Sequence, residues 1–149
     1  MELRQNTSLK DYTTLGIGGS ALYLIEVSSL DQMKKAIFFA KEKNLPYLVL
    51  GKGSNTLFHD RGYLGVVILN KITTIEWNNN FVTAGAGYSF SLLGVQSAKK
   101  ALSGLEFASG IPASVGGAVF MNAGANGQET FDSLVSVGFL NADENDILR

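Results

Sequence analysis

A glycine-rich pentapeptide, Gly51-Lys52-Gly53-Ser54-Asn55, directly follows the apolar run of residues 45–50. The apolar run is typical of a short buried strand, and the glycines at its end let successive backbone N–H groups face outward without side chains in the way. A concave group of such N–H donors binds phosphate oxygens. Taken alone, the pentapeptide is explained equally well as an ordinary glycine turn between strands.

A second segment, residues 108–127, holds five glycines, five alanines and no charged residue. Glycine has no Cβ, so this backbone can approach a large ligand closely. Its serine and asparagine side chains offer uncharged hydrogen bonds. The length approaches that of a membrane span, but Pro112 and the glycines are unfavourable in a lipid-facing helix and no basic cluster flanks the segment. Together, the two glycine-rich segments favour a phosphate-binding loop at Gly51.

Known nucleotide-binding motifs fit poorly. The sequence has no Gly-x-x-x-x-Gly-Lys-Ser/Thr, so a P-loop is unsupported. Residues 16–21 match the loose Gly-x-Gly-x-x-Gly/Ala pattern, but a Rossmann fingerprint needs a strand before it and a helix after it. Here a polar stretch precedes the glycines and a β-type run follows them. We therefore reject the Rossmann interpretation.

Three blocks of the chain, in order, resemble the UDP-N-acetylenolpyruvoylglucosamine reductase family, flavoenzymes of peptidoglycan precursor synthesis. The blocks are Asn6-Thr7-Ser8-Leu9 through Thr13-Thr14-Leu15-Gly16-Ile17-Gly18-Gly19, then Leu50-Gly51-Lys52-Gly53-Ser54-Asn55-Thr56-Leu57, then Ser109-Gly110-Ile111-Pro112-Ala113-Ser114-Val115-Gly116-Gly117-Ala118 with Met121-Asn122-Ala123-Gly124-Ala125. The resemblance covers nearly the whole chain, which corresponds to about the first half of the family's sequence.

This resemblance implies an α+β fold of the vanillyl-alcohol-oxidase type, in which FAD lies between two small α+β subdomains. We expect the first subdomain at residues 1–69, and an incomplete second one at residues 70–149. The family's substrate domain is absent from this chain. The chain ends where a further strand is expected to begin, which is more typical of part of a longer protein than of a complete one.

The resemblance also implies the cofactor-binding residues. The loop that holds the FAD pyrophosphate would comprise Gly51, Gly53, Ser54 and Asn55. The segment that wraps the cofactor would comprise Gly110, Ile111, Pro112, Ser114, Val115, Gly116, Gly117, Asn122 and Gly124. Three positions depart from the family pattern: Ala113 replaces glycine, Leu15 replaces phenylalanine and Asn126 replaces tyrosine. The additional methyl group of Ala113 would lie close to the cofactor.

The activity implied by the resemblance is reduction of UDP-N-acetylglucosamine enolpyruvate to UDP-N-acetylmuramate, with NADPH as co-substrate, in the cytoplasm. The family uses an arginine from a Tyr-Arg pair, a serine and a glutamate. No Tyr-Arg pair occurs here, and the arginines are only Arg4, Arg61 and Arg149. We therefore expect no catalytic residue in this chain. A flavin-binding or interaction module without catalysis is the alternative.

Composition agrees with a cofactor-binding domain. The 149 residues, 46% hydrophobic and 17% charged, suffice for one domain or two small halves. The net charge of −1 lacks the excess of positive charge that is typical of nucleic-acid-binding proteins. The absence of cysteine excludes disulfides, thiolate catalysis and cysteine-ligated metals, and is compatible with a cytosolic protein. The first six residues contain no apolar signal core, and no membrane partner is expected.

The patterning predicts a βαβ unit whose glycine loop follows a strand's carboxyl end, where open α/β sheets bind ligands. Ser29 and Gln32 have the spacing of a capping box at the start of the helix. The expected elements, in order, are a strand at 21–27, a helix from Leu30 closed by 41–44, strands at 45–50 and 65–69, a hairpin of 73–77 and 81–84, a helix at 90–102, a strand at 134–140, and a polar turn at 141–146 leading into Ile147.

Three isolated residues have a functional and a structural interpretation. His59, the only histidine, lies in an expected exposed turn, which is unfavourable for acid–base catalysis without a positioned partner. Trp77 could stack on a ring, but in an alternating strand core packing is more common. Glu106 could reach a flavin or substrate, although a solvated surface position is more usual.

Overall fold

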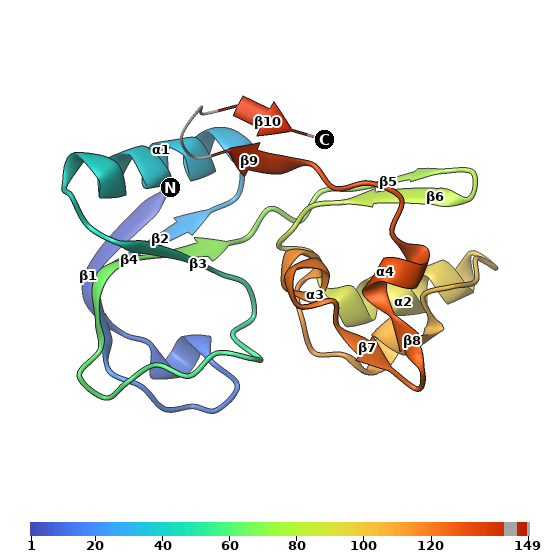
Figure 1. Ribbon diagram of the computed structural model, residues 1–149, viewed down its shortest axis with the longest axis horizontal. Helices are drawn as coiled ribbons and strands as arrows, with labels where there is room; N and C mark the ends of the chain where they lie inside the picture. The colour runs from blue at the N-terminus through green and yellow to red at the C-terminus, as the bar shows by residue number, and fades with distance from the viewer. Residues whose placement is uncertain (142–145, 149) are drawn as a thin grey trace.

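A four-stranded sheet forms the first lobe of the molecule (Figure 1). The computed structural model describes residues 1–141 and 146–148. The strand order is β1-β2-β4-β3, with β1 antiparallel to β2, and with β2 and β3 both parallel to β4. The strands are β1 (Glu2–Ser8), β2 (Ser20–Val27), β3 (Tyr47–Leu50) and β4 (Tyr63–Asn70).

The helix α1 (Leu30–Glu42) connects β2 to β3 and packs on one face of this sheet. On β4, Val66 and Ile68 face the α1 side, whereas Val67 and Leu69 pack with Leu9 and Phe58 on the other face. A strand buried on both faces is apolar without alternation. The predicted βαβ unit is therefore confirmed, with β4 inserted between its two parallel strands.

The second lobe is built from a hairpin, short helices and one small core (Figure 1). Phe90 and Phe107 pack edge to face in this core, with ring centroids 5.9 Å apart. The elements are β5 (Ile75–Asn78), β6 (Phe81–Ala84), α2 (Phe90–Lys99), the 3₁₀ helix η2 (Glu106–Gly110), α3 (Val115–Met121), β7 (Gly124–Ala125), β8 (Gln128–Glu129) and α4 (Thr130–Ser133). The first lobe also contains a short 3₁₀ helix, η1 (Lys10–Tyr12).

After α4 the chain returns to the first lobe. The strand β9 (Phe139–Asn141) pairs antiparallel with β10 (Asp146–Leu148). Leu140 packs against the cluster beneath α1, and Figure 1 shows β9 beside that helix. The predicted strand at 134–140 is thus wrong for residues 134–138, which alternate in hydrophobicity but are exposed and outside any strand. Most of the predicted polar turn at 141–146 lies outside the described residues.

The predicted helix at 90–102 is three residues too long, because α2 ends in a left-handed turn at Ala101. Ala101 N–H donates to Ala98 O, and Leu102 N–H donates to Ser97 O, each at 3.0 Å. This is the Schellman arrangement, which normally has glycine at the left-handed position. Asn44 after α1 and Asn122 after α3 have the same left-handed conformation.

The predicted hairpin and the predicted capping box can be compared with the structure. The β5–β6 hairpin is confirmed, with Asn79 at φ 50° in its turn. Ser29 Oγ caps α1 by accepting from Gln32 N–H, but Gln32 Oε1 accepts from Ser28 N–H, one residue before the expected partner. Within the described residues, no helix combines the length and apolar character needed to cross a bilayer.

Candidate functional site

The predicted phosphate-binding loop follows β3 at the carboxyl edge of the sheet, with Gly51 immediately after the last strand residue. Among the described residues, the backbone N–H groups of Gly53, Ser54 and Asn55 have no hydrogen-bond acceptor. Unpaired successive N–H groups are the donors that a phosphate-binding loop requires. The loop therefore has the donor set that the sequence predicted.

Gly53 has a structural reason to be glycine. It is buried with φ +64°, and a Cβ at this position would lie 2.9 Å from Thr13 Cα and 3.0 Å from Tyr12 C. Thr14 N–H donates to Gly53 O at 3.2 Å. The segment after η1 therefore occupies the space beside the Gly53 α-carbon, so a side chain there would first disturb this packing.

The two lobes meet where Gly51 lies against Ser114. A Cβ at Gly51 would overlap Ser114 Oγ and lie 3.1 Å from Ser114 Cβ. Ser114 is only 3% exposed, and its Oγ accepts a 3.2 Å hydrogen bond from Gly117 N–H as the N-cap of α3. Gly51 and Ser114, predicted from two separate segments, are thus in direct contact.

The start of α3 is fixed by a crossing segment, residues 86–90. Phe90 N–H donates to Ala113 O at 3.0 Å, and Val115 N–H donates to Tyr88 O at 2.9 Å, around a β-bridge that joins Ser89 to Ser114. Gly116 N–H donates to Ala86 O at 2.8 Å. The N-termini of α2 and α3 are therefore adjacent, although 25 residues separate their caps, Ser89 and Ser114.

Lys52 provides a second link between the lobes. Its Nζ donates to Ser89 Oγ at 2.7 Å, and Ser89 Oγ also accepts from Leu92 N–H at 3.4 Å as the N-cap of α2. The sequence places Lys52 within the predicted loop without indicating a role for it, and Ser89 lies outside the predicted site segments. The small-residue run of 84–87, which precedes Ser89, is the signal that would have indicated a close backbone approach here.

The predicted glycines of the second segment fall into two groups. A Cβ at Gly116 would lie 2.8 Å from Ala86 Cβ, and one at Gly124 would lie 2.7 Å from Gln128 O. These two glycines are required by packing within the lobe. In contrast, a Cβ at Gly110 would meet nothing within 4 Å, and one at Gly117 only Ser114 Oγ at 3.1 Å. Gly110 therefore leaves open backbone that a ligand can approach, whereas a Cβ at Gly117 would press on the Ser114 hydroxyl group that caps α3.

The remaining predicted residues have different surroundings. Ile111 and Val115 are half-buried against the second core, whereas Pro112 is exposed. Asn122 is engaged internally, since its Nδ2 donates to Glu129 Oε2 at 2.6 Å and its Oδ1 accepts from Phe131 N–H at 3.0 Å. The cofactor contacts of Asn122 and Gly124 stay predictions.

Ala113, which departs from the family pattern, is buried in the second core together with Phe90 and Phe107. Its methyl group is therefore accommodated inside the protein. Leu15 is exposed on the loop after η1, and Asn126 lies in the β7–β8 turn at φ 55°.

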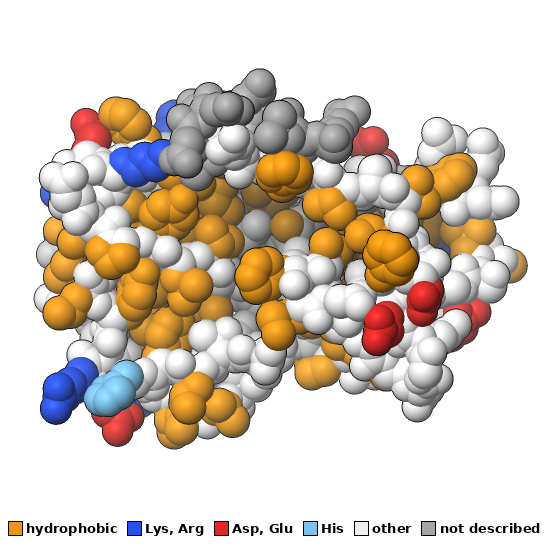
Figure 2. All heavy atoms as spheres, viewed as in Figure 1, with side chains coloured by type: hydrophobic (Ala, Val, Ile, Leu, Met, Phe, Trp, Pro, Cys, Tyr) orange, Lys and Arg blue, Asp and Glu red, His pale blue; other side chains and the backbone are white. Residues whose placement is uncertain are grey.

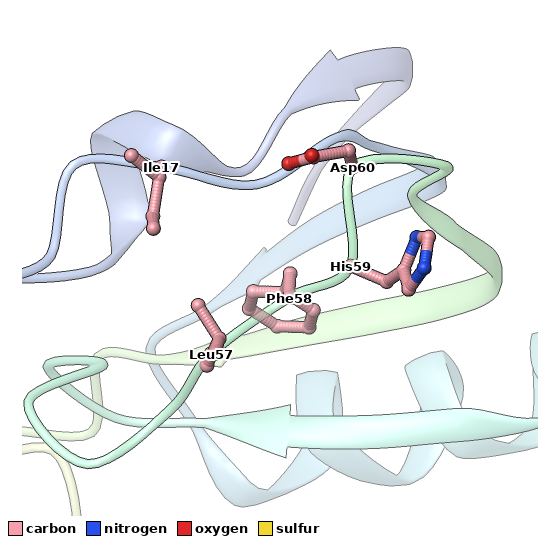
Figure 3. Close-up of a pocket in the computed structure, with 5 residues that line it drawn as sticks. All are labelled: Ile17, Leu57, Phe58, His59 and Asp60. Atoms are coloured by element: carbon pink, nitrogen blue, oxygen red, sulfur yellow. The ribbon is translucent and has the colours of Figure 1, made fainter.

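A shallow cavity of about 460 Å³ lies in the first lobe, lined by Ile17, Leu57, Phe58, His59 and Asp60 (Figure 3). Figure 3 shows the His59 ring turned away from Ile17 and Leu57. His59 Nδ1 accepts from Arg61 N–H at 3.0 Å in an exposed turn. Its position agrees with the structural interpretation of this histidine.

The other two isolated residues also have structural partners. Glu106 is exposed, and its Oε2 accepts from Gly104 N–H at 2.7 Å. Trp77 is half-buried against the second core, with Lys100 Nζ 5.1 Å from its ring centroid. The described residues contain no cluster of three His, Asp or Glu side chains suited to a metal ion.

The surface around the lobe boundary is largely uncharged. On the face shown in Figure 2, hydrophobic and uncharged side chains occupy the middle, whereas most of the lysine, arginine and acidic side chains lie toward the sides. Such a surface suits a large cofactor with an apolar ring system, provided that its phosphate groups have separate donors.

Comparison with known proteins agrees with this arrangement. The family model described as FAD binding domain matches residues 21–145. The UDP-N-acetylenolpyruvoylglucosamine reductase of Protochlamydia amoebophila is 55% identical over 140 residues, which are 93% of this chain and 47% of the relative. The corresponding reductase of Chlamydia muridarum is 46% identical, over 91% of this chain and 46% of the relative.

Solved structures give the same relationship. The crystal structure of the UDP-N-acetylenolpyruvylglucosamine reductase from Thermus caldophilus superimposes with a TM-score of 0.70 at 43% identity, over 88% of this chain and 45% of that one. The 6-hydroxy-D-nicotine oxidase of Arthrobacter nicotinovorans has a TM-score of 0.51 at 17% identity, over 66% of this chain and 23% of that one, and shows similarity of fold alone. The chain spans about half the length of the curated relatives.

Proposed function

The chain belongs to the FAD binding domain family, and we propose that it is the flavin-binding part of a UDP-N-acetylenolpyruvoylglucosamine reductase. The observation that carries this proposal is the loop after β3, whose unpaired N–H groups at Gly53, Ser54 and Asn55 adjoin the contact between Gly51 and Ser114. A dinucleotide with a central diphosphate fits this donor set and the open backbone at Gly110.

In this proposal the loop Gly51–Asn55 holds the FAD pyrophosphate, and the segment from Gly110 to Gly117 lies along the cofactor. The first-turn N–H groups of α3 are internally bonded, since Val115, Gly116 and Gly117 donate to Tyr88 O, Ala86 O and Ser114 Oγ. The diphosphate therefore depends on the loop N–H groups, and α3 contributes mainly a close, side-chain-free surface. Subdomains at 1–69 and 70–149 belong to the same proposal.

When bound, FAD supplies hydride transfer, which the protein's side chains cannot carry out. The residues of this chain bind and orient the cofactor at the junction of the lobes. The proposed reaction reduces UDP-N-acetylglucosamine enolpyruvate to UDP-N-acetylmuramate, with NADPH, in the cytoplasm. Groups that donate the proton and grip the UDP-sugar lie outside this chain in the proposal, because no residue here matches the family's arginine, serine and glutamate.

The test is a chimera in which these 149 residues replace the matching half of the Protochlamydia amoebophila reductase. We expect the purified chimera to retain FAD and to oxidise NADPH only when UDP-N-acetylglucosamine enolpyruvate is present. The chain alone, reconstituted with FAD, should show no substrate-dependent oxidation. A chimera that holds FAD but lacks this turnover would contradict the proposed activity, and turnover by the chain alone would contradict the placement of the catalytic groups.

A further inference from the structure

Lys52 is the only charged residue in the segments that build the candidate site. These segments are residues 12–19, 51–55, 84–89 and 109–117, which otherwise contain apolar, glycine, hydroxyl and amide residues. A diphosphate at neutral pH carries negative charge that binding must desolvate, and desolvating an uncompensated charge is costly. Any side-chain compensation from these segments must therefore come from Lys52.

The ammonium group of Lys52 makes one hydrogen bond to the protein and retains further N–H donors for a ligand. Its Nζ donates to Ser89 Oγ at 2.7 Å, but an ammonium has three N–H donors. Within the described residues, no carboxylate lies within ion-pair distance of Lys52. The side chain is thus a cation without an ion-pair partner among the described residues, and it extends from the loop that carries the unpaired N–H groups to the N-cap of α2.

The position of this cation is electrostatically unfavourable without an anion. Ser89 is the N-cap of α2, and a helix N-terminus carries partial positive charge. The positive end of α2 repels the ammonium group of Lys52. An anion bound between this ammonium group and the loop would be attracted by the ammonium group and by the loop N–H groups. The arrangement therefore suits a bound phosphate group better than it suits the empty protein.

We propose that Lys52 forms a charged contact with the diphosphate of FAD and so makes this site select flavins that carry phosphate groups. This inference rests on the proposed FAD site, and it assigns a side chain to a site that otherwise relies on backbone donors. The hydrogen bond to Ser89 positions the ammonium group at the junction of the two lobes.

The test measures dissociation constants of FAD and riboflavin by flavin fluorescence for the wild-type chain, Lys52→Met and Lys52→Arg. Lys35→Met, on the exposed side of α1, is the matched control for loss of one surface lysine. We expect Lys52→Met to weaken FAD binding about tenfold, equivalent to about 1.4 kcal/mol. Lys52→Met should leave the dissociation constant of riboflavin unchanged. The dissociation constants of FAD for Lys52→Arg and Lys35→Met should be close to that of the wild type.

Salt provides a second measurement, because exposed charge contacts are screened as ionic strength rises. Between about 50 and 500 mM NaCl, FAD affinity should fall more for the wild type than for Lys52→Met. Equal FAD affinity and equal salt dependence in both proteins would overturn the role of Lys52 while leaving the FAD site intact. Equal weakening of FAD and riboflavin would show that Lys52 only links the lobes. If the wild-type chain itself bound no FAD, the proposed function would fail with it.

Discussion

The α-carbon of Gly51 faces the hydroxyl group of Ser114 so closely that a Cβ at Gly51 would overlap Ser114 Oγ. Ser114 Oγ cannot move away freely, because it caps α3 through Gly117 N–H. This contact joins the phosphate-loop candidate of the first lobe to the second glycine-rich segment. It explains why both positions carry small residues.

The first prediction is a double-mutant cycle at this contact. Gly51→Ala should destabilise the chain by about 1–3 kcal/mol through overpacking. Ser114→Gly should cost only a few tenths of a kcal/mol, because glycine is tolerated at an N-cap. The double variant should recover most of the loss, since the clashing side chain is gone. Urea unfolding measures the coupling, and strictly additive effects would argue against the contact.

The second prediction separates a glycine that folding requires from one that folding can lose but cofactor binding cannot. Gly53→Ala should lower the free energy of unfolding by about 2–4 kcal/mol, because φ is positive and the Tyr12–Thr13 backbone fills the space. Gly117→Ala lies in a helix, where alanine is favoured over glycine by about 1 kcal/mol, but its Cβ would lie only 3.1 Å from Ser114 Oγ; because these two effects oppose each other, stability should change by less than about 1 kcal/mol. FAD affinity of Gly117→Ala should nevertheless fall about tenfold. Unchanged affinity in that variant would place the cofactor away from α3.

The third prediction concerns the end of α2. Ala101 adopts φ 57° at the position where a Schellman turn prefers glycine. Ala101→Gly should therefore raise the free energy of unfolding by about 0.5–1 kcal/mol. Ala98→Gly, within the same helix, is the control and should lower it, because glycine is unfavourable in helices. Thermal and urea unfolding of both variants provide the measurement, and equal losses would contradict the left-handed turn.

Local signals made much of the first lobe predictable. Residues 66–69 form an unbroken apolar run because both faces of β4 are buried, and Ser29 caps α1 as its spacing indicates. The strand β1 was missed because it lies at the sheet edge and is mostly polar and exposed. Its place is set by pairing with β2, which composition does not encode.

In the second lobe, tertiary contacts override local preference. The helix α3 contains Gly116 and Gly117, which are poor helix formers, and it is held by the Ser114 cap and by the bond from Gly116 N–H to Ala86 O. Residues 134–138 alternate like a strand but have no partner strand. For the site, motif resemblance located the loop and the second segment, whereas the contact between Lys52 and Ser89, 37 residues apart, required the structure.

The fourth prediction concerns stability in acid. The guanidinium of Arg4 on β1 contacts Glu26 on β2 at 2.6 Å and Glu2 on its own strand at 2.8 Å. The hydrogen bond and charge of Arg4 lower the pKa of the Glu2 carboxyl group. A lowered pKa in the folded state stabilises the protein above the unfolded-state pKa, and this contribution is lost as the pH falls through the folded-state value.

The stability difference between the wild type and Glu2→Gln should therefore be largest near neutral pH and should shrink toward about pH 3. Urea unfolding at several pH values measures this difference, with Glu42→Gln, at the exposed end of α1, as the control. A difference that grew as the pH fell would contradict the role of Arg4.

The flavin bound at the lobe junction can be identified directly. The purified chain, or the chain reconstituted with an equimolar mixture of FAD and FMN, is desalted and denatured, and the released chromophore is identified by chromatography. We expect the chromophore to be FAD, because the loop Gly51–Asn55 presents unpaired N–H donors suited to a diphosphate. Release of FMN alone, or a folded protein that stays colourless after reconstitution with FAD, would contradict this expectation.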